Sequence, residues 1–240
     1  MKKDLKLEVV IPFYNEIENF IKFNEIIDEI DTQKIMFIFL DNGSETDEMK
    51  NYFNSQKYTN RKLITSKKNL GYGGGIVYSK SFIENEFIAW MPGNLKINPK
   101  DSINFFMSEY DNLSKDTLVK AKRIDRKPLD FLKTSLFGIL SSLYFRTNLI
   151  DAGGTPSIVH KSFFKNTKNF PNDFSFDVFV YYFYRSKNLL IIRPKISYTE
   201  RYAGTSHWQN GVRSEINLII KIFSYKRMWT EIIKNDRYEK

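Results

Sequence analysis

Four loops in the first half of the chain place polar side chains directly after apolar runs. Asp41 offers a fixed carboxylate that can accept hydrogen bonds from the donor edge of a nucleobase. The glycines from Gly71 to Gly75 let the backbone approach a sugar or a phosphate closely. The cluster is not the dinucleotide fingerprint, because Ile76 stands where G-x-G-x-x-G requires its third glycine. The loops are Pro12 to Glu16, Asp41 to Ser44, Lys67 to Gly75 and Pro92 to Lys96.

The apolar runs before these loops are typical of strands that a sheet buries on both faces. Strands that alternate with helices predict right-handed crossovers and a mainly parallel sheet, with the carboxyl end of every strand on one edge. Ligands bind beyond those ends in open α/β sheets. We therefore expect the four loops to form one site. The runs are Leu7 to Ile11, Ile35 to Leu40, Lys62 to Thr65 and Phe87 to Met91.

The second half continues the α/β pattern with more basic and aromatic residues. We predict one α/β domain over residues 1–210, with helices flanking the sheet. Residues 211–240 are expected to form a basic, amphipathic helical tail that packs on the domain or extends from it. The further elements expected are a strand over Thr117 to Ala121, a helix over Asp130 to Phe145, a short strand near Ile158, an aromatic helix over Phe174 to Arg185, and strands over Leu189 to Ile192 and Ile196 to Thr199.

Composition narrows the class of protein. The 240 residues contain no cysteine, which excludes disulfides and a thiolate nucleophile. The net charge of +9 indicates an anionic partner, which charge alone leaves open as nucleic acid, a membrane surface or a phosphorylated small molecule. No recognisable nucleic-acid-binding motif is present, so we expect no nucleic-acid partner. No apolar run approaches the roughly 20 residues that span a bilayer, and no signal-length core follows the N-terminus. These features predict a cytoplasmic protein, with the inner face of the membrane as an alternative.

Six motifs in order resemble family 2 glycosyltransferases with the GT-A fold, which is a Rossmann-like α/β fold. The resemblance is greatest to the branch that contains dolichyl-phosphate mannosyltransferase and related polyprenyl-phosphate sugar transferases, and it extends through about Trp208. The motifs are VVIPFYNE (Val9 to Glu16), LDNGS (Leu40 to Ser44), NLGYGGG (Asn69 to Gly75), Asp151 with Gly154, FSFD (Phe174 to Asp177) and RYAGTS (Arg201 to Ser206).

The resemblance implies a hexosyltransferase of the cell envelope. Such an enzyme moves a sugar, with inversion, from a nucleotide-sugar donor to a lipid-phosphate or cell-surface glycan acceptor. The residues that it implies for donor binding are Pro12, Tyr14, Glu16, Asp41, Asn69, Gly71 and Asn94.

The chain departs from the family pattern at the Asp-x-Asp motif, which holds a divalent metal, Mg²⁺ or Mn²⁺, against the donor pyrophosphate. Pro92 and Asn94 occupy the aspartate positions, and Lys96 replaces a glutamine that is common after them. A neutral amide such as Asn94 is a weak metal ligand. We hypothesise that Lys96 and Arg201 partly replace the metal as cations at the departing diphosphate. The alternative is a degenerate protein that binds nucleotide or glycan without turnover.

The acceptor decides which further residues are needed. A hydroxyl nucleophile needs a carboxylate base, for which Asp177 is the candidate, although a carboxylate in the first turn of a helix is also stabilised by the helix dipole. A lipid phosphate is already anionic and needs cations instead, from Arg123, Arg146 and Arg201. The remaining acceptor-binding candidates are Asp151, which could equally be a turn residue, and His207 with Trp208.

The expected helix over Asp130 to Phe145 admits two interpretations. In the first, a stripe of aliphatic residues is buried in the core. In the second, the helix lies on an anionic membrane surface, because a basic segment precedes it and the C-terminus is also basic. The stripe consists of Leu132, Leu136, Ile139, Leu140 and Leu143, and the basic segment contains Lys120, Lys122, Arg123, Arg126 and Lys127.

Overall fold

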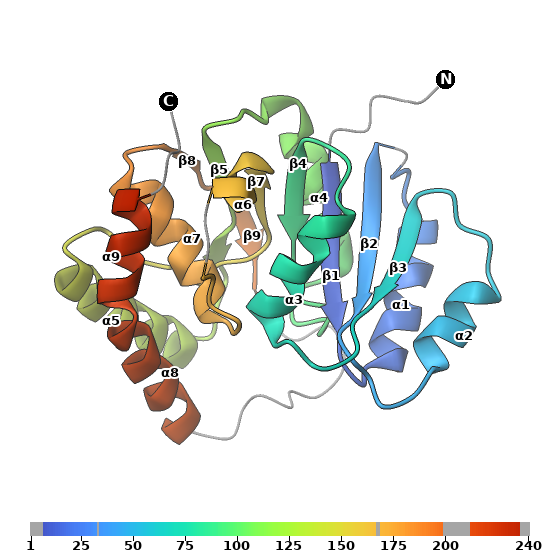
Figure 1. Cartoon of the computed structure of the whole chain (residues 1–240), viewed down its shortest axis with the longest axis horizontal. Helices are drawn as coiled ribbons and strands as arrows, with labels where there is room; N and C mark the ends of the chain where they lie inside the picture. The colour runs from blue at the N-terminus through green and yellow to red at the C-terminus, as the bar shows by residue number, and fades with distance from the viewer. Residues whose placement is uncertain (1–6, 33, 167–168, 199–211, 236–240) are drawn as a thin grey trace.

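The computed structural model describes residues 7–32, 34–166, 169–198 and 212–235. Within these ranges a seven-stranded sheet has the strand order β3-β2-β1-β4-β7-β5-β8. Helices cover both faces of the sheet (Figure 1). The fold is therefore the single-domain, mostly parallel α/β architecture that the sequence predicts.

The parallel half of the sheet is largely buried. Its strands are β3 (Arg61–Thr65), β2 (Ile35–Asp41), β1 (Leu7–Phe13) and β4 (Phe87–Trp90), and each pairs in parallel with its neighbour. Every residue of β1 and β4 is buried, which explains why these strands are continuous apolar runs. The carboxyl ends of the four strands meet at one edge, as expected.

The second half of the sheet corrects one expectation. The strand β7 (Ser157–His160) lies between β4 and β5 (Thr117–Lys120) and is antiparallel to both, so the carboxyl ends do not all share one edge. The strand β8 (Leu190–Ile192) pairs with β5 in parallel. The chain then forms a second, two-stranded sheet from β6 (Lys122–Ile124) and β9 (Lys195–Ser197), and β6 was not predicted.

The two faces of the sheet bury different helices. The helices α1 (Ile17–Asp28) and α4 (Pro99–Glu109) pack over one face, and α2 (Glu48–Asn54) lies beside α1. The helices α3 (Tyr72–Ser79) and α7 (Ser175–Ser186) cover the other face. Shorter helices occupy 80–82, 110–112 and α6 (Ser162–Asn166).

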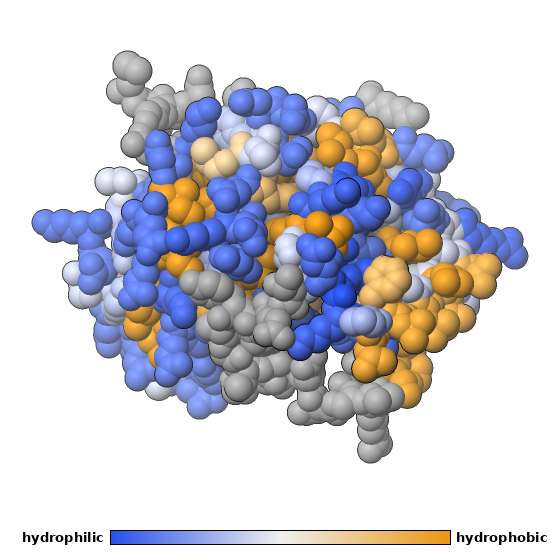
Figure 2. Space-filling model, turned by 180° about the vertical axis from the view of Figure 1, so that it is seen from behind, coloured by the Kyte–Doolittle hydropathy of each residue, from blue (hydrophilic) through white to orange (hydrophobic). Residues whose placement is uncertain are grey.

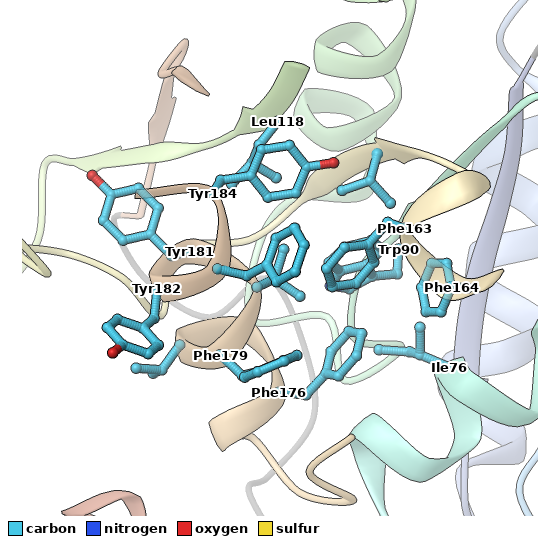
Figure 3. Packing of buried hydrophobic residues seen from close by; sticks show 14 of the residues in the cluster. Ile76, Trp90, Leu118, Phe163, Phe164, Phe176, Phe179, Tyr181, Tyr182 and Tyr184 are labelled. Atoms are coloured by element: carbon cyan, nitrogen blue, oxygen red, sulfur yellow. The ribbon is translucent and has the colours of Figure 1, made fainter. Parts of the chain in front are cut away.

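Aromatic rings dominate the core beneath α7 (Figure 3). Trp90 of β4 packs edge to face against Phe176, and Phe163 contacts Phe183 in the same way. The C-terminal helices are α8 (Val212–Ser224) and α9 (Lys226–Asn235). The fully buried Trp229 of α9 packs on Phe179, so α9 contributes to this core.

The aliphatic stripe of the helix α5 (Pro128–Phe145) is not buried in the core, which corrects the first of the two interpretations of this helix. Gly138, Ser141 and Phe145 are its buried residues, so the helix packs through a narrow face of mostly small side chains. The five stripe residues Leu132, Leu136, Ile139, Leu140 and Leu143 are all exposed. Among the described helices, none is long and apolar enough to cross a bilayer.

Candidate functional site

A pocket of about 270 Å³ lies where the loops after β1, β2, β3 and β4 converge. The predicted donor-binding residues Pro12, Tyr14, Glu16, Asn69 and Asn94 all line it. The same pocket is lined by further residues that were not predicted individually, although all of them except Phe174 lie in the four loops expected to form one site. These are Phe13, Asn15, Asn42, Tyr72, Pro92, Gly93 and Phe174.

Asn42 holds the glycine-rich loop against the end of β2. Its amide nitrogen donates to the carbonyl oxygen of Gly71 at 3.1 Å, and its amide oxygen accepts from Leu70 N–H at 3.2 Å. Gly71 has φ of 75°, and an added Cβ would lie 2.3 Å from the carbonyl oxygen of Asn172. The glycine is therefore required by both backbone conformation and space. Asn42 lies in the loop from Asp41 to Ser44 that the sequence assigns to the site, but its type and position do not single out its side chain for this role.

Asp41 lies beside the pocket and does not line it. Its side chain accepts the backbone N–H of Ser44 at 2.9 Å, and the residue is 4 % exposed. This contact closes the turn after β2. The structure thus gives Asp41 a structural hydrogen bond, while its role toward a nucleobase stays a prediction.

A second cavity of about 360 Å³ adjoins the first pocket. The two share Tyr72, Pro92, Asn94 and Phe174, and the rings of Tyr72 and Phe174 stack at 4.7 Å. Four residues predicted for catalysis or acceptor binding line the second cavity, although they come from distant parts of the chain. They are Lys96, Arg123, Asp151 and Asp177.

Asp177 is held by a row of side chains across three strands. Trp90, Ser157 and Lys120 are register partners on β4, β7 and β5. Trp90 Nε1 and Lys120 Nζ both donate to Asp177 Oδ1, at 3.0 and 3.2 Å, and Lys120 also donates to Ser157 Oγ at 3.1 Å. Asp177 is also in the first turn of α7, where the helix dipole favours its negative charge.

Burial dominates the electrostatics of this row. Lys120 is 0 % exposed, and its burial lowers the pKa of its amine, while the charge of Asp177 acts in the opposite direction. Burial also raises the pKa of Tyr72 well above its usual value, and the Asp177 carboxylate adds to that shift. Lys120 therefore does not belong to an exposed basic segment, which corrects the sequence interpretation.

Three arginines surround Asp151. Arg123 Nε lies 2.6 Å from Oδ1, Arg193 Nη2 lies 2.9 Å from Oδ2, and Arg126 Nη1 lies 3.6 Å from Oδ1. Three guanidinium groups against one carboxylate leave an excess of two positive charges in this cluster. The Nε atoms of Arg126 and Arg193 are buried without a hydrogen-bond partner among the described residues. Of the three arginines, Arg123 lines the second cavity, so its guanidinium is the one that an anion in this cavity could contact.

The loop after β4 does not supply the ligands that a divalent metal needs. The side-chain oxygen of Asn94 accepts the backbone N–H of Lys96 at 3.2 Å. Glu16 is the one carboxylate among the described residues that line the first pocket. No cluster of three or more acidic or histidine side chains that could hold a metal occurs in the described ranges. The residues present therefore fit a divalent cation poorly.

Three predicted site residues lie outside the described residues. They are Arg201, His207 and Trp208.

Solved structures resemble this fold at low sequence identity. Glucosyl-3-phosphoglycerate synthase from Mycobacterium tuberculosis, in complex with Mn²⁺, UDP and glucosyl-3-phosphoglycerate, has a TM-score of 0.65 at 12 % identity, over 93 % of this chain and 78 % of that chain. The same enzyme with Mn²⁺, UDP-glucose and glycerol 3-phosphate gives 0.64 at 12 % identity, over 93 % and 79 %. A mycobacterial protein gives 0.69 at 15 % identity, over 94 % and 76 %. No curated protein matches the sequence.

The sheet, its flanking helices and the loops at its carboxyl edge define a protein with the GT-A glycosyltransferase fold. Residues 8–168, more than half of the chain, match the family described as glycosyl transferase family 2. The chain belongs to that family, and its activity class is glycosyltransferase.

Proposed function

We propose that this protein transfers a hexose from a nucleotide-sugar donor to an acceptor that carries a phosphate group. The observation that carries the proposal is the junction of the two cavities at Tyr72, Pro92, Asn94 and Phe174. A donor in the first pocket would present its sugar at this junction. An acceptor in the second cavity would meet the sugar from the opposite side, as a single inverting displacement requires.

The proposed donor is a uridine diphosphate sugar. This choice is supported by the similar solved structures, which were determined with UDP or UDP-glucose. In this chain, Asn69 offers an amide group at the pocket, and Glu16 offers a carboxylate. Such groups can pair with the donor and acceptor edges of a base and with ribose hydroxyls.

The proposed acceptor is phosphorylated because of the arginines around Asp151. Arg123 lines the acceptor cavity, and the cluster carries more positive charge than Asp151 balances. The similar enzyme was solved with glycerol 3-phosphate, which also carries a phosphate. The resemblance to polyprenyl-phosphate sugar transferases favours a lipid phosphate within this class.

The reaction forms a bond between an acceptor oxygen and the anomeric carbon and breaks the bond from that carbon to the diphosphate. If a hydroxyl attacks, Asp177 takes its proton. If a phosphate oxygen attacks, no base is needed, and Arg123 positions the nucleophile. Lys96, which lines the acceptor cavity, would balance charge on the leaving diphosphate. Because the residues around Asn94 fit a metal poorly, we expect weak dependence on Mg²⁺ or Mn²⁺.

The test is thermal unfolding with UDP-, GDP-, dTDP- and CMP-sugars, each in Mn²⁺ and in EDTA. A donor at about 100 times its Kd should stabilise the protein by about 2.7 kcal/mol. A shift with UDP-sugars in EDTA supports the proposal, whereas a shift that requires Mn²⁺ contradicts the weak metal dependence. Binding without turnover of any phosphorylated acceptor would favour the catalytically degenerate alternative, which the absent aspartates at positions 92 and 94 motivate.

Asp177→Asn separates the two possible nucleophiles. Loss of transfer with an unchanged donor-induced shift indicates a hydroxyl nucleophile with Asp177 as the base. Retention of transfer indicates a phosphate nucleophile. Urea unfolding of the variant is the control, because Asp177 also balances the buried Lys120.

A further inference from the structure

The helix α5 presents an apolar face to solvent, which we call the α5 face. Leu132 is 64 % exposed and Leu143 is 73 % exposed, and the face also contains Leu129, Leu136, Ile139 and Leu140. Figure 2 shows a patch of apolar residues at the lower right, on the side where α5 lies. A contiguous apolar patch of this kind on a protein surface marks a site of contact.

Basic side chains lie at both ends of the α5 face. At the start of the helix, the exposed Lys127 is the N-cap residue. At its end, Arg146 is the C-cap residue, and Lys226 Nζ lies 4.3 Å from the ring centroid of Tyr144. The apolar face is thus bracketed by cations, which an anionic surface would neutralise.

We propose that the α5 face docks on an anionic lipid membrane. An apolar helical face inserts among the headgroups and acyl chains, and flanking lysines and arginines pair with lipid phosphates. A second copy of this chain is a poorer partner, because a symmetric contact through α5 would bring two sets of these cations together. The net charge of +9 adds to that repulsion and to the attraction of anionic lipid.

The opposite side of α5 connects the docking surface to the acceptor cavity. Thr134 and Phe137 of α5 line that cavity together with Arg123. A membrane on the α5 face would therefore lie one helix away from the arginine cluster. The docked membrane would thus supply a lipid headgroup as the phosphorylated acceptor, and this part of the inference rests on the proposed function. Membrane docking itself rests on the α5 face alone.

The experiment measures binding of the full chain to sedimented vesicles in the absence of sugar nucleotide. The vesicles are phosphatidylcholine alone or with about one third phosphatidylglycerol. The variant is L132Q/L136Q/L143Q, which removes apolar surface without changing charge. Because leucine and glutamine have similar helix propensities, α5 should persist. The matched control for the single variant L143Q is L190Q. Leu190 is 60 % exposed and is thus an exposed leucine comparable to Leu143, but it lies on β8 outside the α5 face.

We expect binding to the anionic vesicles at least about tenfold stronger than to phosphatidylcholine. The triple variant should bind the anionic vesicles at least about tenfold more weakly than the wild type, and L190Q should bind them as the wild type does. Thermal unfolding should be unchanged in all variants. Equal vesicle binding by wild type and triple variant would overturn the proposal, as would absence of binding to anionic vesicles. A wild-type dimer that the triple variant lacks would assign the face to a second copy instead. Because no donor is present, none of these outcomes depends on transferase activity.

Discussion

Removal of the buried amine by Lys120→Met tests how the row beneath the site is stabilised. Lys120 Nζ lies 3.2 Å from Asp177 Oδ1, and both side chains are excluded from water. At an effective dielectric constant of about 20, two unit charges at this distance attract by about 5 kcal/mol. The substitution leaves the Asp177 carboxylate buried without its countercharge. We expect the free energy of unfolding to fall by about 3–5 kcal/mol.

The assay is urea unfolding followed by circular dichroism, for Lys120→Met, Asp177→Asn and the double variant. In the double variant no uncompensated charge remains, and the amide oxygen introduced at position 177 can still accept from Trp90 Nε1. We therefore expect the double variant to be more stable than Lys120→Met, with a coupling energy of about 2–3 kcal/mol. The control is Lys62→Met, because Lys62 forms an exposed ion pair with Glu84 and should change stability by less than about 1 kcal/mol. Additive losses in the double variant would refute the reasoning.

Three further expectations concern other positions. Gly71→Ala should abolish the donor-induced rise in Tm, because its Cβ would lie 2.3 Å from the Asn172 carbonyl oxygen; an unchanged rise would contradict this. Burial lowers the pKa of His160 below 6.5, so its contribution to stability is present above pH 6.5 and is lost as pH falls through the lowered pKa; His160→Gln should flatten that part of the pH–stability profile. Glu8→Gln should cost about 1–3 kcal/mol in urea unfolding, because a neutral amide oxygen replaces the buried carboxylate oxygen that accepts two backbone N–H groups at 2.7 and 2.9 Å, and an amide NH2 group is buried beside it.

The sequence predicted the parallel half of the sheet well because its central strands are buried on both faces and read as apolar runs. Phe87 to Met91 is the clearest case. The order of the remaining strands could not be read in the same way. The antiparallel insertion of β7 depends on contacts with β4 and β5, which are distant in the chain. The short strand β6 has two basic residues among its three and carries no apolar signal.

The candidate site was predictable where its residues follow strands, and the pocket lining contains five of the seven donor-binding candidates. Asn42 was missed because an amide beside an aspartate gives no indication of which side chain turns toward the glycine loop. Lys120 was misread because a lysine in a basic segment normally faces water. In the structure its amine is buried, where it donates hydrogen bonds to Ser157 on β7 and to Asp177 on α7, and both partners are distant in the chain.

The stripe on α5 is the converse case, because apolar residues that the sequence allowed in the core lie at the surface. Its apolar spacing is compatible with a core helix and with a surface helix, since periodicity identifies a face and not its partner. Buried Gly138 and Ser141 are the residues that decide the outcome, because they let α5 pack closely through its small side chains. The aliphatic residues on the other side of α5 are therefore exposed to solvent.

The row formed by Trp90, Ser157 and Lys120 links the site to the order in which the chain is synthesised. Three strands must pair before these side chains align, and the carboxylate that neutralises the amine comes last in the sequence. A nascent chain that has emerged only through β5 carries a lysine with no counter-ion for the interior. The ion pair between Lys120 and Asp177 can therefore form only after α7 has been synthesised.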